Sequence, residues 1–383
     1  MTRSIVHLTT YLQGGAGRSI VDVACAQRAA GHHVLVVTSR SATGGYGNYP
    51  HYLDRLAAAG VPFWLEDSLF ERRVEANQPV LDRLRAERPP ASVDTVHAHA
   101  GVPARIGLAF AEGAARRPVV VQTQHGWGAN KTAEQSRADL ETLAAVDAVL
   151  VTSEGTRALL YGMGIPTSRM TVVPCGLPAE SPPPSRPAVA LASRYRAQGR
   201  IVVGCVGSVT PNKNQALVLA AVAASQSRPL AAVIVGEGGD GLGARCHELG
   251  VADAVHLAGY QRDADTWMPA FDVLAVPSFT EGQGLVVLEA FRAGVPVVAS
   301  RIPALCELVQ EGSTGWLFDP RDARSLIAAL TRAIELGEPE RQRVRRSARA
   351  IFDGGYTTAA MLGRLERVYG AIEARFKTSS LAG

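Results

Sequence analysis

Short apolar runs alternate with longer stretches of mixed apolar and polar residues along most of the chain. An apolar run of roughly four to eight residues without strict alternation is typical of a parallel strand buried on both faces, and the stretches between the runs have helical length. In the first half, this pattern predicts helices such as residues 19–30 and 154–163, and buried strands at residues 5–9, 34–38, 93–97, 119–123, 148–152 and 170–173.

A proline-rich segment at residues 178–187 separates this series from a second one. The second series predicts strands near residues 201–206, 232–235, 255–257, 273–276 and 297–299. Two such series indicate two doubly wound α/β domains, and open sheets of this kind bind ligands beyond the carboxyl ends of their strands. Two such domains facing each other would form a deep cleft, so we expect the chemistry in the loops that follow the strands.

Length and composition fit this organisation, because a chain of 383 residues with 47% hydrophobic residues can bury two cores. We place a first domain at residues 1–180, a linker at 181–198, a second domain at 199–353 and a final segment at 354–383. The five cysteines lack the spacing of a disulfide framework, and no apolar run has the length of a signal peptide or a membrane span. We therefore expect a cytoplasmic protein with reduced thiols.

The most informative segment follows the predicted strand at 273–276. Two glutamates, Glu281 and Glu289, bracket a loop and the start of a helix that read Gly282, Gln283, Gly284, Leu285 and Val286. The start of a helix directs unpaired N–H groups toward the crevice, where a diphosphate fits, and the glycines let the backbone approach a ligand closely. Carboxylates suit vicinal hydroxyls and repel phosphates, so we expect Glu281 to face a sugar ring and Glu289 a ribose.

A single lysine follows the predicted strand at 201–206. Lys213 is one of only three lysines among the 39 basic residues, which argues against a surface filler. An ammonium group at the mouth of a helix can donate a charge-assisted hydrogen bond to a phosphate oxygen, a contact of roughly 1.5–3 kcal/mol. We expect Lys213 to bind phosphate.

The segment around Glu281 and Glu289, continued through residues 290–300, resembles the Glu, seven residues, Glu motif of the retaining glycosyltransferases of family 4 (group 1 type). The resemblance extends over nearly the whole chain. It implies the GT-B fold, in which two Rossmann-like domains face each other across a cleft and the final helix packs back on the first domain. The first domain would bind the acceptor and the second a nucleoside diphosphate sugar, with no other cofactor and no metal.

The resemblance also implies roles for three loops. Ser208 stands where many members have an arginine on the diphosphate, so either its hydroxyl makes a neutral hydrogen bond or another base such as Arg18 compensates. Tyr260 matches a loop whose backbone holds the nucleotide base. Gly14 and Gly15 match the N-terminal glycine loop, which lies close to the donor phosphate and the acceptor.

Three histidines follow or end predicted strands of the first domain. His125 matches an active-site histidine of the family, where the imidazole hydrogen-bonds a hydroxyl of the donor sugar. His99 either lines the cleft on the acceptor side or is structural. A zinc site would require His97, His99 and His125 to converge, and the spacing suggests no carboxylate or thiol partner, so we predict no metal.

Other ligand classes are less well supported. An NAD site would need a third glycine after Gly15 and Gly17, and an acidic residue at the end of the strand at 34–38, and the chain has neither. The net charge is +4, and clustered arginines at 72–73, 116–117 and 341–349 suit either an anionic membrane surface with a lipid-linked acceptor or a solvated surface. No interleaving of basic and aromatic residues indicates nucleic-acid binding.

The sequence therefore predicts transfer of a sugar from a UDP- or GDP-sugar to a hydroxyl of a small-molecule, glycan or lipid-linked acceptor. The resemblance to the family implies that the configuration is retained. The predicted catalytic residues are His125, Lys213 and Glu281, with Gly14 and His99 on the acceptor side. The predicted donor-binding residues are Gly15, Ser208, Lys213, Tyr260, Glu281, Gly282, Gln283, Gly284, Leu285, Val286 and Glu289.

Two alternatives remain open at this stage. A nucleotide-sugar epimerase with the same fold would process the donor without an acceptor. A catalytically weak binding protein is suggested by Ser208 and by Cys175, which stands where the family commonly has asparagine.

Overall fold

The chain divides into two compact units, each built on a parallel sheet. A computed structural model describes residues 2–69, 71–73, 75–128, 131–225, 229–239 and 241–381, with side chains up to residue 376. Unit 1 consists of Met1–Gly176 with Thr358–Gly383, and unit 2 of Leu177–Thr357. Each unit is described by itself below.

The sheet of unit 1 has the strand order β3-β2-β1-β4-β5-β6-β7, and every strand pair within it is parallel. Its strands are β1 (Ser4–Leu8), β2 (His33–Ser39), β3 (Phe63–Glu66), β4 (Thr95–Ala98), β5 (Val119–Gln124), β6 (Ala148–Val151) and β7 (Met170–Val172). The order reverses between β1 and β4, which makes this pair the topological switch point of the sheet.

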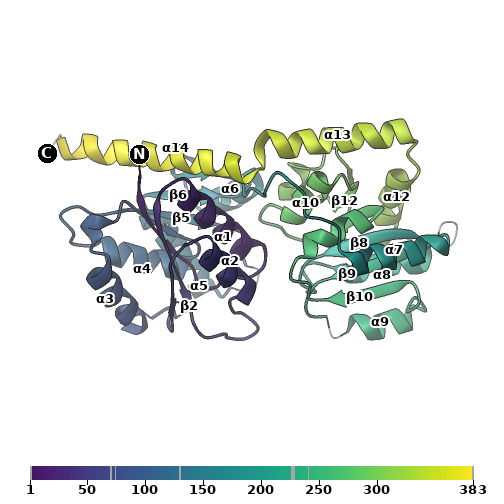
Figure 1. Cartoon of the computed structure of the whole chain (residues 1–383), viewed down its shortest axis with the longest axis horizontal. Coiled ribbons are helices and arrows are strands. Elements are labelled where there is room, and N and C mark those ends of the chain that lie inside the picture. The colour runs from purple at the N-terminus through teal and green to yellow at the C-terminus, as the bar shows by residue number, and fades with distance from the viewer. Residues whose placement is uncertain are drawn as a thin grey trace. The chain divides into compact units, whose positions relative to one another are not determined.

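Helices cover both faces of this sheet. They are α1 (Gly14–Ala29), α2 (Pro50–Ala58), α3 (Gln78–Glu87), α4 (Gly101–Ala111), α5 (Ala133–Ala145), α6 (Glu154–Gly162) and α14 (Thr358–Leu381), with short 3-10 turns at Glu75–Asn77, Pro90–Ser92 and Thr167–Arg169. The C-terminal helix α14 packs against α1 and contacts β5 (Figure 1). Unit 1 is therefore completed by a segment that follows unit 2 in the sequence.

The sheet of unit 2 has the order β10-β9-β8-β11-β12-β13, again with parallel pairs throughout, and its switch point lies between β8 and β11. Its strands are β8 (Ile201–Val206), β9 (Leu230–Val235), β10 (Val255–Gly259), β11 (Val273–Val276), β12 (Val297–Ser300) and β13 (Trp316–Phe318). Its helices are α7 (Arg186–Ala197), α8 (Gln215–Ala224), α9 (Leu242–Glu248), α10 (Leu285–Ala293), α11 (Pro303–Cys306), α12 (Ala323–Ile334) and α13 (Glu338–Gly355), with a 3-10 helix at Ala264–Ala270.

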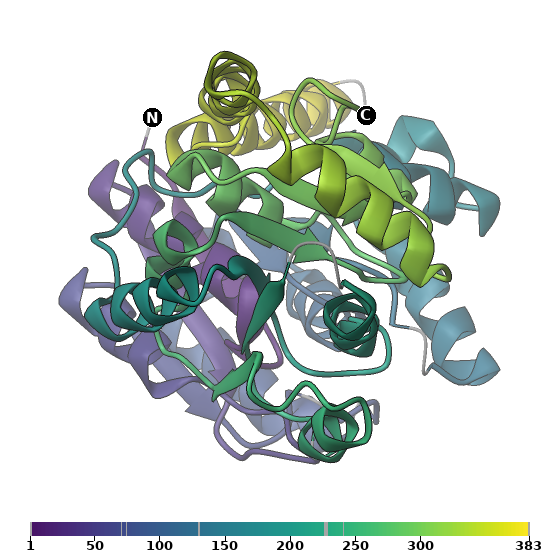
Figure 2. The same ribbon diagram turned by 90° about the vertical axis from the view of Figure 1, so that its right-hand side faces the viewer.

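Successive residues of these strands feed two separate hydrophobic cores. One core joins one face of the sheet to α7, α10 and α13, and the other joins the opposite face to α8, α9 and α12. Figure 2 shows this sheet with helices on both sides. Alternation of side chains along each strand explains why the strands read as continuous apolar runs, since both faces are covered. The predicted fold class of two doubly wound sheets is confirmed.

The predicted linker at 181–198 differs from the structure, because residues 186–197 of it form α7. The hydroxyl of Ser185 accepts a hydrogen bond from the N–H of Ala188, and the proline after Arg186 stands in the first turn. Proline suits this position, whose N–H has no helical partner. Ala188, Ala192 and Tyr195 then bury one face of α7 in the core of unit 2.

Candidate functional site

The switch point of unit 2 brings Lys213 and Glu281 together. Lys213 belongs to the loop after β8 and Glu281 to the loop after β11, and these strands are neighbours. The Nζ atom of Lys213 lies 2.6 Å from Oε1 of Glu281, and the hydroxyl of Ser278 donates to the same oxygen at 2.7 Å. The side chain of Glu281 is only 11% exposed, whereas that of Lys213 is 31% exposed, so the ammonium group has the better access to a ligand.

Asn214 fixes the loop that carries Lys213. It has φ of 54°, in the left-handed region, where a short amide side chain is tolerated better than most. Its Nδ2 donates to the carbonyl of Pro277 at 3.2 Å and to that of Pro320 at 2.9 Å. The first bond ties the loop after β8 to the turn after β11, and so sets the separation between Lys213 and Glu281, while the second ties this loop to the segment after β13.

Glycines allow a third loop to pack on the first. A Cβ atom at Gly236, just after β9, would lie 1.9 Å from the carbonyl oxygen of Gly207. The next residue, Glu237, accepts a backbone hydrogen bond from Val209 at 2.7 Å. The loop after β9 therefore supports the backbone on both sides of Ser208, whose own carbonyl accepts from Nε2 of Gln215 at 3.0 Å.

The loop after β11 ends at the N-terminus of α10. Gly284 has φ of 88° and precedes Leu285 and Val286, the first residues of the helix. The N-cap residue Gly284 has no side chain to cap the helix, and the first N–H groups of α10 point toward the carboxyl edge of the sheet. Gln283 and Glu289 are both buried, and Glu289 lies in the second turn of α10. The two glutamates thus have different environments. Glu281 forms the ion pair with Lys213, whereas Glu289 lies within α10.

Tyr260 lies farther along the same edge. It follows β10, two strands away from β8, which corresponds to roughly 10 Å at the usual strand spacing. Its side chain is 42% exposed. Tyr260, the α10 N-terminus and Lys213 therefore span an elongated stretch of the edge rather than one compact pocket.

In unit 1, the glycine loop after β1 opens α1 earlier than predicted, at Gly14 rather than at Ser19. Gly14 has φ of 57°, and its carbonyl accepts from the hydroxyl of Tyr52 at 3.0 Å. A Cβ atom at Gly17 would lie 2.5 Å from the backbone carbon of Leu12, so this glycine lets the helix start close to the preceding turn. Gly14 and Gly15 thus form the first turn of α1 at the carboxyl edge of the sheet.

Four buried or half-buried histidines gather beside this edge. His99 follows β4 and His125 follows β5, and the ring nitrogens Nδ1 of His99 and Nε2 of His125 are 3.2 Å apart. His7 of β1 lies on the other side of His99, with 3.0 Å between Nδ1 of His7 and Nε2 of His99. His97 of β4 contacts Tyr369 of α14 and Thr123 of β5 instead.

Sequence reasoning missed His7. The residue sits in the middle of a predicted strand, and a histidine on an apolar strand usually signals only a satisfied core position. The available signal was the parallel pairing of β1 with β4, which places His7 opposite His97. Of the three histidines named for a zinc site, His97 and His99 instead converge with His7 in a cluster of potential ligand atoms within 4.8 Å of one another.

Burial keeps these rings neutral. Removal from water lowers the pKa of His7 and of His125 to about 4, and lowers the pKa values of His97 and His99 well below the ordinary value. Cys175 lies beside the group, with Sγ 4.0 Å from Nδ1 of His125. Burial raises the pKa of this thiol to about 11, so it stays protonated.

Several of the clustered arginines are paired with carboxylates, including Arg341 and Arg349 at the two ends of the cluster at 341–349. Arg72 contacts Asp139 at 2.7 Å, Arg116 contacts Asp94 at 2.6 Å, and Arg117 contacts Asp147 at 2.7 Å. Arg18, named above as a substitute base, lies 3.7 Å from Asp22 within unit 1. Within the described part of the chain, no helix combines the length and the apolar character needed to cross a membrane.

Comparison with known proteins agrees with this arrangement. A family model described as Glycosyltransferase Family 4 matches residues 13–181, and one described as Glycosyl transferases group 1 matches residues 200–335. A D-inositol 3-phosphate glycosyltransferase of Gordonia bronchialis is 29% identical over 326 residues, covering 76% of this chain and 70% of that protein. One from Mycobacterium tuberculosis (strain F11) is 30% identical over 319 residues, covering 76% of this chain and 65% of that protein.

Solved structures show the same fold. The Anabaena protein Alr3699/HepE, solved in complex with UDP and glucose, has a TM-score of 0.82 at 20% identity, covering 96% of this chain and all of that one. Sucrose-phosphate synthase of Thermosynechococcus elongatus has a TM-score of 0.81 at 19% identity, with 97% and 100% coverage. With both family models matched, one in each unit, this chain belongs to the family 4, group 1 glycosyltransferases and has their GT-B fold.

Proposed function

We propose that this glycosyltransferase moves a sugar from a UDP-sugar to an acceptor hydroxyl, with retention at the anomeric carbon. The observation that carries the proposal is the contact between Lys213 and Glu281 at the switch point of unit 2, beside the uncapped start of α10. A cation and helix N–H groups suit a diphosphate, and a carboxylate beside them suits sugar hydroxyls. Alr3699/HepE has been solved with UDP and with UDP-glucose, which favours uracil as the first base to test.

The ion pair has a specific role in this proposal. In the structure, Glu281 neutralises Lys213. A diphosphate would take over the ammonium group through charge-assisted hydrogen bonds, and the carboxylate would then accept from a hydroxyl of the sugar. Gly282 and Gln283 would approach the diphosphate, with the N–H groups of Leu285 and Val286, and Glu289 and Tyr260 would lie toward the nucleoside.

The reaction would exchange one bond for another at the anomeric carbon. The bond from that carbon to the diphosphate oxygen breaks, and a bond to the acceptor oxygen forms on the same face. The departing diphosphate accepts the proton of the acceptor hydroxyl. Lys213 and the α10 N–H groups would stabilise the charge that develops on the leaving group, so no divalent metal is needed.

Residues of unit 1 would complete the reaction. His125 would hydrogen-bond a hydroxyl of the donor sugar, Gly15 would lie near the donor phosphate, and Gly14 and His99 would lie on the acceptor side. The curated relatives named above carry D-inositol 3-phosphate in their names, so a phosphorylated polyol is the first acceptor to test, ahead of glycans and lipid-linked acceptors. The ion pairs of Arg72, Arg116 and Arg117 weaken the case that these three side chains contact an anionic membrane.

The test begins with thermal-shift measurements of UDP, GDP, ADP and their common sugar conjugates, with and without EDTA. A ligand that binds only the folded protein raises its Tm. We expect a shift by UDP that EDTA does not remove. The active UDP-sugar is then incubated with D-inositol 3-phosphate and a panel of glycans, and the anomeric configuration of the product is read by NMR.

Three outcomes would contradict the proposal. A shift by GDP or ADP alone would overturn the choice of base. A product of inverted configuration would overturn retention. A donor that is bound and converted to its epimer, or bound and left intact with every acceptor, would replace transfer by one of the two alternatives.

A further inference from the structure

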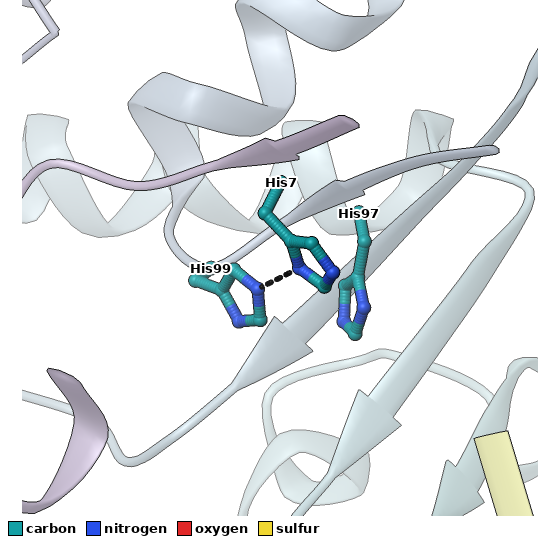
Figure 3. A group of neighbouring side chains, drawn as sticks. All are labelled: His7, His97 and His99. Carbon is teal, nitrogen blue, oxygen red and sulfur yellow. Dashed lines mark hydrogen bonds between the residues drawn. The ribbon is translucent and has the colours of Figure 1, made fainter. Parts of the chain in front are cut away.

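A chain of hydrogen bonds leads from the interior of unit 1 to His125. The side-chain carbonyl Oε1 of Gln27, on α1, lies 2.7 Å from Nε2 of His7. The other ring nitrogen of His7 lies 3.0 Å from His99, and the other ring nitrogen of His99 lies 3.2 Å from His125. Figure 3 shows the rings of His7 and His99 turned toward each other, with His97 beside them.

The chain of hydrogen bonds has a fixed donor-to-acceptor direction, because a carbonyl oxygen only accepts hydrogen bonds. With Oε1 of Gln27 as acceptor, Nε2 of His7 carries the proton, and its Nδ1 is left as an acceptor. Nε2 of His99 must then donate to Nδ1 of His7, which leaves Nδ1 of His99 to accept from Nε2 of His125. These three rings are neutral at pH 7, because burial lowers their pKa values.

Tyr369 of α14 contacts the other end of the Gln27 amide. The amide Nε2 of Gln27 donates to the hydroxyl of Tyr369 at 3.4 Å, and this hydroxyl lies 2.7 Å from Nδ1 of His97. The hydroxyl can therefore donate to His97, whose Nε2 then donates to Thr123 at 2.6 Å. Turning the amide of Gln27 over would reverse every one of these bonds, so Gln27 is the residue that sets the direction.

A metal site is the competing interpretation of the same cluster. His7, His97 and His99 offer nitrogens within 4.8 Å of one another. All six of their ring nitrogens, however, already lie within 3.2 Å of a protein partner. Metal binding would break several of these bonds, whereas the hydrogen-bonded chain uses all of them.

We propose that Gln27, His7 and His99 are positioning residues that hold His125 in its Nε2–H tautomer, with Nδ1 left to accept a hydrogen bond. This inference rests on the proposed function for its consequence: His125 would accept a hydrogen bond from a sugar hydroxyl rather than donate one. In the structure the protonated thiol of Cys175, with Sγ at 4.0 Å, is the weak donor to this Nδ1, and a sugar hydroxyl would replace it.

The test reads tautomers directly. In protein labelled with ¹⁵N-histidine, long-range ¹H–¹⁵N correlation spectra at pH 7 distinguish the Nε2–H form from the Nδ1–H form, and single substitutions assign the signals. We expect the Nε2–H form for His7, His99 and His125. The substitution Gln27→Met removes the acceptor for Nε2 of His7. The donors and acceptors along the chain of hydrogen bonds should then exchange roles, and His125 should show the Nδ1–H form.

A matched control is Gln122→Met. Gln122 is as buried as Gln27, and it hydrogen-bonds Gln124 rather than a histidine, so this substitution should leave His125 unchanged. Tyr369→Phe is the second variant, in case Gln27→Met does not fold. It removes the acceptor for Nε2 of Gln27 while keeping the ring, so the amide can turn over and His125 should show both tautomers.

Several results would overturn the inference. These are an Nδ1–H or averaged His125 in the unsubstituted protein, a His125 unaffected by Gln27→Met and Tyr369→Phe, or stoichiometric zinc in protein purified without chelator. The spectra need neither nucleotide nor turnover. A protein that fails to bind UDP would therefore contradict the proposed function without affecting the inference about the tautomer of His125. If transfer is observed, Gln27→Met should lower it by roughly 10-fold, the loss of one hydrogen bond, with the Kd of UDP little changed.

Discussion

At the scale of single residues, the contact between Glu281 and Lys213 makes their substitutions behave differently. Glu281 competes with a diphosphate for the ammonium group, because both are anions within reach of the same cation. We expect Glu281→Ala to leave the Kd of UDP unchanged or lower, since Lys213 is released, while transfer falls by roughly 100-fold or more. Isothermal titration with UDP and a transfer assay check the two halves of this prediction.

Glu281→Gln is the control, because it keeps the shape and removes the charge. It should match Glu281→Ala in UDP affinity. Weaker UDP binding by both variants would mean that the carboxylate organises the phosphate site rather than competing with it.

Lys213→Ala should have the opposite profile. Removing the ammonium group takes a charge-assisted hydrogen bond from the diphosphate, so the Kd of UDP should rise by roughly 10- to 100-fold and transfer should fall with it. The comparison is Lys131→Ala, because Lys131 is paired with Asp139 in unit 1. Equal UDP affinity for the two lysine variants would remove Lys213 from the donor site.

Sequence alone was sufficient to place residues that a local pattern marks, although their roles stay predictions. Lys213 and Glu281 stand out because each follows a strand, and the adjacency of β8 and β11 brings them to 2.6 Å. The histidine chain could not be foreseen in this way. It depends on side chains from β1, α1 and α14 meeting at one point, and the contact of His97 with Tyr369 joins residues 272 positions apart.

At the scale of elements, we expect the close packing of the loop after β8 on the loop after β9 to be needed for stability and for UDP binding. Gly236→Ala would force a Cβ atom to within 1.9 Å of the carbonyl oxygen of Gly207, and backbone cannot move away as a side chain can. We expect a loss of about 1–3 kcal/mol in the free energy of unfolding, together with weaker UDP binding. Urea unfolding and titration with UDP measure the two effects.

Gly243→Ala serves as the comparison. Gly243 lies in α9, where a Cβ atom would meet nothing within 4 Å, so alanine should be neutral or slightly stabilising. The prediction would be wrong if Gly236→Ala were as stable as Gly243→Ala and bound UDP equally well. The close contact between the two loops would then not be required.

Long apolar runs made most elements predictable, and short or special ones were missed. The predicted strand at 201–206 coincides with β8, whereas β3 and β13 have only four and three residues and carry little pattern. The helix α7 was hidden because its serine and proline signals lie within a proline-rich stretch. There the same residue types that mark a linker also mark a helix start.

At the scale of the whole molecule, acid should act first on unit 1. His7, His97, His99 and His125 all belong to this unit, and burial holds the pKa of His7 and of His125 at about 4, against 6.5 ordinarily. A depressed pKa means that the unfolded chain binds protons more readily between pH 6.5 and 4. The contribution of these neutral histidines to the free energy of unfolding is therefore complete above pH 6.5. It is lost as the pH falls toward 4, by roughly 3 kcal/mol for His7 alone.

Hydrogen exchange at pH 7 and pH 5 tests this prediction, after correction for the intrinsic exchange rates. We expect β1, β4 and β5 to lose protection before the strands of unit 2. In His7→Gln, the slope of stability against pH should be shallower, whereas a substitution of the exposed His33 should leave it unchanged. Simultaneous loss of protection in both units would point to a different acid-sensitive group.

The return of α14 to unit 1 has a consequence for the order of synthesis. The helix carries Tyr369, which is buried against His97 and Gln27, yet it leaves the ribosome after every residue of unit 2. Unit 2 can complete its own core as soon as it emerges, because all of its residues are then available. Unit 1, although translated first, cannot complete its fold until α14 has been synthesised. A transcript truncated before α14 would therefore yield a folded unit 2 joined to an incompletely folded unit 1.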